Sequence, residues 1–265
     1  MRPKVVNTGM NKATVYLIGA GPGAPDLLTL RAARLLEQAD IVFYDALVHP
    51  DVIALATKAE KIAVGKRCGK HSTAQKFINK RLIDAAKKYQ RIVRVKGGDP
   101  MLFGRAQEEL DALEAAGIPV EIVPGVTAAL AASAQIGVSL TRRGLSRNVV
   151  FVTPRVGEME NESDWAAAAL TADTAAIYMG AGQAKLIADT LIRRGRPAHT
   201  PVALVESASL AGAKVNYATL GELPALAQQA GAGPAVILLG EVLREKLDAQ
   251  RALALQVWQP GRKRG

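Results

Sequence analysis

The chain has 265 residues, of which 49% are hydrophobic, and this is enough apolar material for two modest domains or one large one. Its 34 Lys and Arg residues against 24 Asp and Glu residues give a net charge of +10, which favours a partner with many carboxylates or phosphates. The single cysteine, Cys68, excludes an internal disulfide and a cysteine-based zinc site, and we expect no metal ligands.

Two kinds of partner are disfavoured. No uncharged apolar run reaches the roughly 20 residues that cross a bilayer, so we expect no membrane association. Aromatic residues make up only 4% and do not alternate with basic ones, so we expect no nucleic-acid partner, although the charge alone would permit one. Without a signal-like start, the chain is expected to be cytoplasmic.

The first half of the chain repeats one pattern of an apolar strand, a loop rich in glycine or charge, and a helix. Strands are predicted at residues 14–18, 41–44, 61–64, 91–95 and 120–123, and the clearest helices at 27–39, 73–89 and 105–116. Asp26 is the expected N-cap of the first helix. Apolar strands separated by helices form a parallel sheet, and ligands bind outside the carboxyl ends of its strands. Five loops should therefore share one edge: residues 19–26, 45–49, 65–72, 97–104 and 124–128.

The second half begins after a basic connector, residues 135–147, that has no clear period. Strands are expected at 148–152, 174–180, 201–206, 214–220 and 234–240, and helices at 163–170, 183–194, 220–229 and 244–257. The connection at 207–212 is too short for a parallel crossover, so this sheet should be mixed. We predict α/β domains at 13–140 and 141–245, with flexible or helical extensions at 1–12 and 246–265.

The loop after the fourth strand, in VRVKGGDPMLFGR, has the composition of a binding loop. Gly97 and Gly98 let a ligand approach the backbone, Asp99 supplies a carboxylate, and Pro100 stiffens the exit. Taken alone, the same residues would also suit an ordinary turn from strand to helix.

The GAGPG loop after the first strand invites a dinucleotide-binding interpretation. Ala24 stands where the third glycine of that fingerprint belongs, and Pro22 and Pro25 disturb the turn. The interpretation also leaves GGDP and the later motifs unexplained, so we do not favour it.

Eight motifs in order resemble the tetrapyrrole methylase family, and most of all its members that methylate uroporphyrinogen III. They are GAGPG, YDALV, VGKR followed by HS, VRVKGGDPMLFGR, VPGVTAA, SLTRRG, YMG and GPAVILLGEV, spread over about residues 14–243. The resemblance implies two α/β domains with an active-site cleft between them, and a homodimer. It also implies a C-methyltransferase that moves two methyl groups from S-adenosylmethionine to uroporphyrinogen III, giving precorrin-2 for sirohaem or cobalamin and releasing S-adenosylhomocysteine.

The resemblance also implies roles for particular residues. Asp45 matches the catalytic base and Lys66 a proton donor, although Asp45 could instead cap the helix after Pro50 or make a turn, and Lys66 could bind carboxylates or be solvated. Cofactor contacts fall on Pro22, Gly97, Gly98, Asp99, Leu102, Thr127, Ala128, Met179, Ala208, Pro234 and Ala235. The carboxylates of the substrate would be bound by Arg67, His71, Arg105, Arg142 and Arg143. Taken alone, Met179 would more often be a core residue, and each of these cations would more often be a solvated surface charge.

The sequence departs from the family pattern at a few positions. Arg142 replaces a usual histidine, Pro154 and Arg155 replace a glycine and a histidine, and Ala208 stands where a glycine often contacts the cofactor. With no oxidase or chelatase segment ahead of the methylase part, the chain resembles the single-function form. A sister enzyme that acts on a later precorrin, an RNA nucleotide or a modified histidine remains an alternative, as does a non-catalytic protein that binds anions or nucleic acid.

Overall fold

Two five-stranded sheets form the cores of the chain in this computed structural model, which describes residues 13–64, 71–156, 163–231 and 233–257. The chain divides into two compact units, Met1–Thr127 and Ala128–Gly265, with one sheet in each. The first sheet is parallel throughout and the second is mixed, so the predicted fold class is confirmed in both sheets.

The first sheet has the strand order β3-β2-β4-β1-β5. Its strands are β1 (Thr14–Gly19), β2 (Ile41–Tyr44), β3 (Glu60–Ala63), β4 (Arg91–Lys96) and β5 (Val120–Val123). All four neighbouring pairs are parallel. The carboxyl ends of the five strands therefore lie at one edge, as the sequence predicted.

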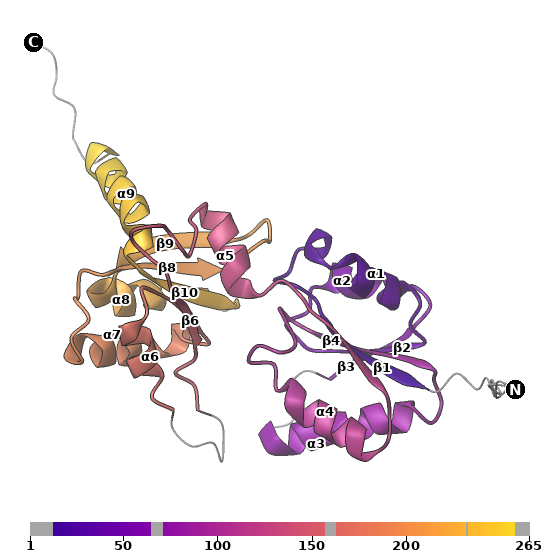
Figure 1. The fold of residues 1–265 in the computed structure, drawn as a ribbon. Coiled ribbons are helices and arrows are strands. Elements are labelled where there is room, and N and C mark those ends of the chain that lie inside the picture. Colours follow the sequence, from indigo (N-terminus) through magenta and orange to yellow (C-terminus); the bar gives the residue numbers. More distant parts are fainter. Residues whose placement is uncertain (1–12, 65–70, 157–162, 232, 258–265) are drawn as a thin grey trace, which may run out of the picture. The chain divides into compact units, whose positions relative to one another are not determined.

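Helices cover both faces of the first sheet, as Figure 1 shows. They are α1 (Leu30–Glu37), α2 (Pro50–Ala54), α3 (His71–Ala85) and α4 (Ala106–Ala115). One apolar cluster joins α1 and α2 to the sheet, and a second lies on the face that α3 and α4 cover, where Ile78, Leu82 and Leu113 are buried. Because helices cover both faces of the sheet, the strands are apolar on both faces, as the sequence showed.

Two helix starts differ from the sequence interpretation. Residues 25–27 form a short 3-10 turn, and Thr29 caps α1 by accepting a hydrogen bond from the Ala32 amide (3.1 Å). The prediction that Asp26 caps this helix is therefore wrong, because Asp26 lies inside the preceding turn. The alternative that Asp45 caps the helix after Pro50 is also wrong, since His49 Nδ1 occupies that role.

The second sheet has the strand order β6-β7-β10-β8-β9. Its strands are β6 (Val149–Val152), β7 (Thr174–Tyr178), β8 (Pro201–Glu206), β9 (Lys214–Thr219) and β10 (Ala235–Gly240). Only β6 and β7 pair in parallel, while β10 pairs antiparallel with β7 and β8, and β8 with β9. The short connection between β8 and β9 has the antiparallel geometry that its length required.

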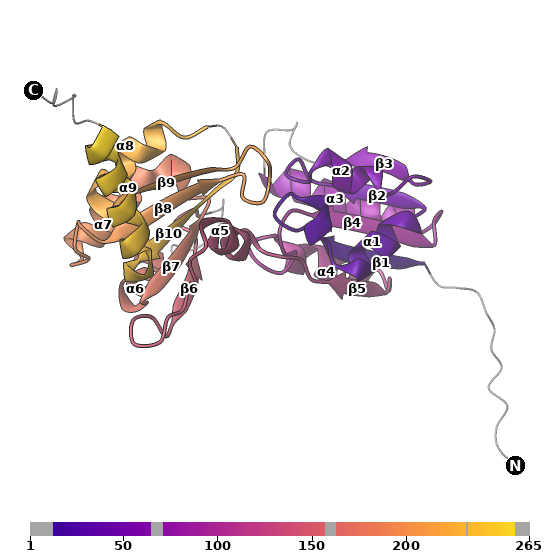
Figure 2. The same cartoon turned by 90° about the horizontal axis from the view of Figure 1, so that it is seen from above.

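The helices of the second unit are α5 (Ala128–Ile136), α6 (Trp165–Thr171), α7 (Ala184–Arg193), α8 (Leu223–Gln228) and α9 (Arg244–Val257). The first of these contacts β10, and α6, α7 and α8 share one apolar cluster with the sheet. The last, α9, packs against β8 and β9 (Figure 2). Among the described helices, none combines the length and apolar character that crossing a bilayer requires.

The division between the units falls between Thr127 and Ala128, whereas the change in sequence composition suggested residue 140. Helix α5 accounts for the difference, because it packs on the second sheet. At its start the Ala129 amide donates to the Tyr178 hydroxyl at the end of β7 (3.0 Å). Tertiary contacts of this kind leave no mark in local composition.

Candidate active site

Glycines bring three loops together at the carboxyl edge of the first sheet. The loops after β1 and β4 form an antiparallel bridge, in which the Gly21 amide donates to Gly98 O (3.2 Å) and the Gly98 amide donates to Gly21 O (2.7 Å). A Cβ atom on Gly19 would lie 2.6 Å from both Gly125 Cα and Gly98 O. Only glycine permits this approach between the loops after β1, β4 and β5.

The carboxylate of Asp99 links two of these loops. Its Oδ1 accepts from the Met101 amide (2.8 Å) and its Oδ2 from the Gly125 amide (2.9 Å). The side chain is half-buried, and each carboxylate oxygen can accept a second hydrogen bond. Asp99 is therefore a structural link that can also accept from a ligand hydroxyl or ammonium group.

Gly98 leaves space for a ligand beside the backbone. Its φ is +66°, and a Cβ atom added there would meet no protein atom within 4 Å. Gly97 is tighter, since its added Cβ would lie 3.2 Å from Leu47 Cβ. Pro22 and Leu102, predicted to contact the same ligand, are half-buried in the neighbouring loops.

Strained backbone marks the loops after β4, β7 and β8. Among the described residues other than glycine, all that have a positive φ lie there: Phe103 (54°), Arg105 (55°), Met179 (55°), Ser207 (50°) and Ser209 (74°). A left-handed conformation is costly for a bulky L-residue, and strain of this kind concentrates at functional sites. The strain in the loop after β4 fits the predicted binding role better than an ordinary turn, and Met179 is 42% exposed rather than part of a core.

Asp45, the predicted base, lies directly after β2 and is held by a buried arginine. The Nη2 atom of Arg94 on β4 donates to Asp45 Oδ1 (2.6 Å). The side chain of Arg94 is 1% exposed and that of Asp45 is 29% exposed, so the pair runs from the interior to the loop edge. The other oxygen, Oδ2, lies 4.0 Å from Lys96 Nζ. Oδ2 makes no hydrogen bond with a described residue and is the atom that can accept a proton.

Arg94 belongs to a buried network that the sequence interpretation missed. Glu109 on α4 accepts through its Oε1 from Arg94 Nε and Nη2 (both 3.2 Å), from Lys96 Nζ (2.9 Å) and from Gln75 Nε2 (3.1 Å). Glu109 is 1% exposed and Lys96 4%. A signal for the network was present, because charged residues at 94 and 96 in an otherwise apolar, doubly covered strand require a buried counter-charge.

The charges of the network set the direction of three pKa values. Burial opposes the charge of Arg94, but Glu109 and Asp45 outweigh it and raise the pKa of the guanidinium. Burial and the neighbouring Arg94 lower the pKa of Lys96. Burial also works against the ionised form of Glu109, yet Arg94 and Lys96 hold the pKa of that carboxyl below its ordinary value. The carboxylates thus favour the charged form of Arg94 and the two cations that of Glu109, whereas burial and the repulsion from Arg94 disfavour the charged form of Lys96.

In the second unit Met179, Ala208 and Pro234 lie on the loops after β7, after β8 and before β10, while Ala128 begins α5. The Ser207 amide after β8 donates to Pro234 O before β10 (2.8 Å), which ties these two loops together. Ala235 begins β10 opposite Glu206. Ala208 is buried between two strained serines but lies outside the left-handed region, so its methyl group adds no backbone strain in place of the usual glycine.

The predicted substrate arginines are exposed and partly paired. Arg105 makes two charge-assisted bonds to Glu108 (2.6 and 2.8 Å), and Arg142 pairs with Glu245 (2.7 Å). Arg143 is exposed beside it. Exposed pairs of this type stabilise a protein by about 0–1 kcal/mol, so a substrate carboxylate can replace their partners at little cost.

Three predicted residues cannot be placed in the site. Lys66 and Arg67 lie outside the described residues, and His71 begins α3 with its side chain outside them. The remaining predicted residues fall into two groups, with Pro22, Asp45, Gly97–Leu102, Arg105 and Thr127 in the first unit and the others in the second.

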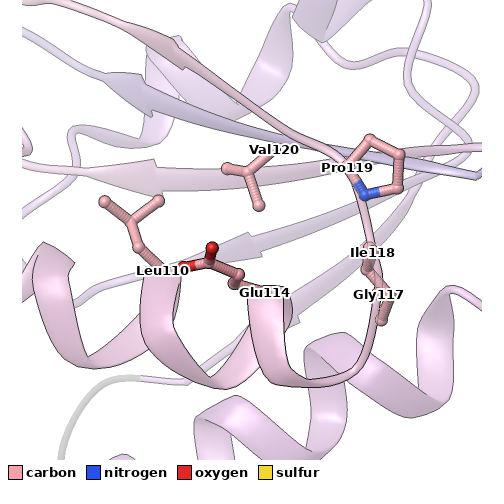
Figure 3. A pocket seen from close by; sticks show the side chains of 6 residues that line it. All are labelled: Leu110, Glu114, Gly117, Ile118, Pro119 and Val120. Carbon is pink, nitrogen blue, oxygen red and sulfur yellow. The ribbon is translucent and has the colours of Figure 1, made fainter.

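Other surface features do not fit a catalytic role. A pocket of about 420 Å³ lies between the end of α4 and the start of β5 (Figure 3), at the amino edge of the sheet. Glu114 is its only charged lining residue, and apolar side chains supply most of its wall. The GAGPG loop does not lead directly into a helix, since α1 begins only at Leu30, and this argues further against dinucleotide binding.

Residues 14–224 match the family described as Tetrapyrrole (Corrin/Porphyrin) Methylases. The chain therefore belongs to the tetrapyrrole methylase family. Its relatives include a siroheme synthase of Zymomonas mobilis, which is 48% identical over 229 residues, covering 86% of this chain and 48% of the relative. The chain thus spans about half the length of the curated relatives that it matches.

Two solved structures of methylases share the fold. A crystal structure of uroporphyrin-III C-methyl transferase from Thermus thermophilus complexed with S-adenyl homocysteine has 41% sequence identity and a TM-score of 0.76, covering 88% of this chain and 100% of that one. A cobalt precorrin-4 methyltransferase has 31% identity and a TM-score of 0.77, covering 87% and 95%. The tetrapyrrole methylase fold expected from the motifs is confirmed.

Proposed function

We propose that this chain is an S-adenosylmethionine-dependent C-methyltransferase that converts uroporphyrinogen III to precorrin-2 by two successive methyl transfers, in sirohaem or cobalamin biosynthesis. The observation that carries the proposal is the carboxylate of Asp45, which a buried arginine holds at the loop edge, while its second oxygen makes no hydrogen bond with the described residues. The choice of substrate is supported by the likeness to a uroporphyrin-III C-methyl transferase over that protein's full length.

The described residues fit S-adenosylmethionine as the methyl donor. The space beside Gly98 is open, Asp99 has acceptor capacity for hydroxyl or ammonium groups, and Met179 offers a soft apolar side chain. We assign Pro22, Gly97, Leu102, Thr127, Ala128, Ala208, Pro234 and Ala235 to the same ligand, as the family pattern predicts. When bound, the cofactor supplies an electrophilic methyl group on a sulfonium.

The chain itself must supply alignment and a base. A pyrrole carbon of an electron-rich macrocycle needs little activation, so alignment contributes most of the rate, and good alignment can be worth several kcal/mol. Addition of the methyl group leaves a cationic macrocycle, which must then lose a proton from another position. Asp45 Oδ2 is the proposed acceptor of that proton, while Oδ1 stays bonded to Arg94.

The proposed substrate has eight carboxylates, which match the positive charge of the chain. Arg105, Arg142 and Arg143 are exposed and have forked donors that suit carboxylates. Arg67 and His71 are proposed for the same role. Lys66 is proposed to donate a proton or to bind a carboxylate.

The test is incubation with S-adenosylmethionine labelled in its methyl group, with uroporphyrinogen III, a later precorrin or total RNA as acceptor. We expect label in uroporphyrinogen III and a product that has gained two methyl groups by mass spectrometry. Label in RNA alone, or in the later precorrin alone, would assign the chain to a sister activity. No transfer to any acceptor would favour a non-catalytic anion-binding protein.

We also propose that the chain is cytoplasmic and forms a homodimer. The family resemblance supports the dimer, and the molar mass of the purified chain in solution, measured by light scattering, tests it. A mass of one chain would reject it.

A further inference from the structure

We infer that Arg94, fixed by Glu109, is a positioning residue that orients the carboxylate of Asp45 so that Oδ2 faces the substrate as the proton acceptor. This inference rests on the proposed function of Asp45, because it assigns a role to the residues behind that base. Arg94 lies in one of the motifs that carry the family resemblance, but the resemblance assigned a role neither to it nor to Glu109.

The guanidinium of Arg94 has no freedom to reorient. Nη1 donates to Val95 O (3.0 Å), Nε to Glu109, and Nη2 to both Glu109 and Asp45. All three nitrogen atoms are therefore occupied, and the side chain is 1% exposed. A planar group anchored at three atoms determines where the carboxylate that it binds must lie.

Glu109 provides the counter-charge that keeps this arginine in the interior. Its Oε1 accepts from Arg94, Lys96 and Gln75, while its Oε2 is buried without a hydrogen-bond partner among the described residues. Buried ion pairs rarely stabilise a fold more than apolar side chains of similar size would, and an unpaired buried oxygen is unfavourable. Stability alone therefore does not explain the cluster, whereas holding Asp45 does.

The geometry also leaves the second oxygen of the base open. Asp45 Oδ1 takes the short bond to Arg94, and Lys96 Nζ lies 4.0 Å from Oδ2, beyond hydrogen-bond distance. The turn that follows β2 fixes the backbone of the base, since the Val48 amide donates to Asp45 O (3.1 Å). Backbone and carboxylate are thus both held, and among the contacts of the described residues none is a hydrogen bond to Oδ2.

A double-mutant cycle in kcat tests the inference, with Arg94→Met, Asp45→Asn and the double variant. If Arg94 acts through Asp45, we expect Arg94→Met to lower kcat by at least about tenfold and to add less than about threefold to the loss in Asp45→Asn. The affinity for S-adenosylhomocysteine, measured by calorimetry, should change by less than about threefold in each variant, because neither Arg94 nor Asp45 is assigned a contact with the cofactor. Losses that multiply, or an unchanged kcat in Arg94→Met or Asp45→Asn, would overturn the inference.

Two further variants separate positioning from general damage. Arg196→Met is a control that removes another largely enclosed arginine, which donates hydrogen bonds to the backbone oxygens of Leu170 and Ala172 in the second unit. This variant should have the kcat of the wild type, and Asp45→Asn should lower kcat by the same factor in its presence. Glu109→Gln keeps the size of the anchor and provides the same cycle if Arg94→Met does not fold. The loss of kcat in Glu109→Gln should also be non-additive with the loss in Asp45→Asn. If the two losses multiply in the double variant, the inference is overturned.

A crystal structure of Arg94→Met with S-adenosylhomocysteine gives a result that does not depend on turnover. The carboxylate of Asp45 should leave its position or become disordered, whereas an unmoved Asp45 would overturn the inference. If wild-type protein transfers no methyl group to uroporphyrinogen III but Asp45 still moves in the variant, the proposed function fails while the role of Arg94 in holding this carboxylate stands.

Discussion

Replacing Gly98 with alanine tests whether the space beside this residue receives the cofactor. Gly98 has a φ of +66° and no protein atom near an added Cβ, so the folded protein itself resists the change only through backbone strain. That strain is about 1–2 kcal/mol, which corresponds to a fall of roughly 2–8 °C in Tm for a chain of this size. A ligand beside the Cα would meet the new methyl group, and we expect a loss of at least tenfold in affinity for S-adenosylhomocysteine, or about 1.4 kcal/mol.

Gly117 provides a closely matched control for this measurement. Its φ is +65° and an added Cβ would again meet nothing within 4 Å, but it lies after α4 at the opposite edge of the sheet. Gly117→Ala should therefore lose about the same free energy of unfolding and bind S-adenosylhomocysteine as the wild type does. Titration calorimetry measures the affinity of both variants for S-adenosylhomocysteine, and thermal unfolding measures their loss of stability. Equal affinity in the two variants would refute the placement of the cofactor beside Gly98.

Three other predictions concern charge. Asp45→Asn should lower kcat by about 10²–10⁴-fold and leave the affinity for S-adenosylhomocysteine nearly intact, and loss of that affinity would reassign Asp45 to the cofactor. Raising the salt concentration should raise KM for uroporphyrinogen III more than it lowers kcat, because the proposed substrate contacts at Arg105 and Arg142 are exposed, and an unchanged KM would count against them. Folding lowers the pKa of Glu109, so its contribution to the free energy of unfolding is present above the ordinary pKa of 4.5 and is lost as the pH falls below that value. The free energy of unfolding in urea should therefore fall less steeply with decreasing pH in Glu109→Gln than in the wild type.

The edge of the first sheet was predictable because strand and loop signals there are local. Alternating apolar strands and helices indicated a parallel sheet, and topology then placed the loops after β1, β4 and β5 together. The close contact of Gly19, Gly98 and Gly125 explains why these positions need glycine, whereas the sequence indicated only that the loops are rich in glycine. By contrast, Thr29 rather than Asp26 caps α1, because the 3-10 turn ahead of it depends on how the chain leaves the loop.

The buried network was not predicted because its members are far apart in sequence and each looks ordinary there. Arg94 appeared as one polar residue in an apolar strand, and Glu109 as one acidic residue in an amphipathic helix. Only the packing of α4 on the sheet brings them together with Gln75 of α3. A charged residue in a strand that is covered on both faces needs a buried counter-charge, so the sequence indicates that Arg94 has an acidic partner. The sequence does not indicate that this partner is Glu109.

The described site residues separate into two classes that suit different parts of the proposed reaction. Buried groups such as Arg94 and Glu109 are locked by several hydrogen bonds each, and a base fixed in this way suits chemistry whose rate depends on alignment. Exposed groups such as Arg105 and Arg142 pair with Glu108 and Glu245, and exposed pairs of this kind are cheap to exchange. A substrate that is methylated twice must present two ring carbons to one base in turn. In the proposed reaction, exchangeable surface contacts would allow the macrocycle to be rebound in a second orientation, while the rigid network would keep Asp45 in the same place for both transfers.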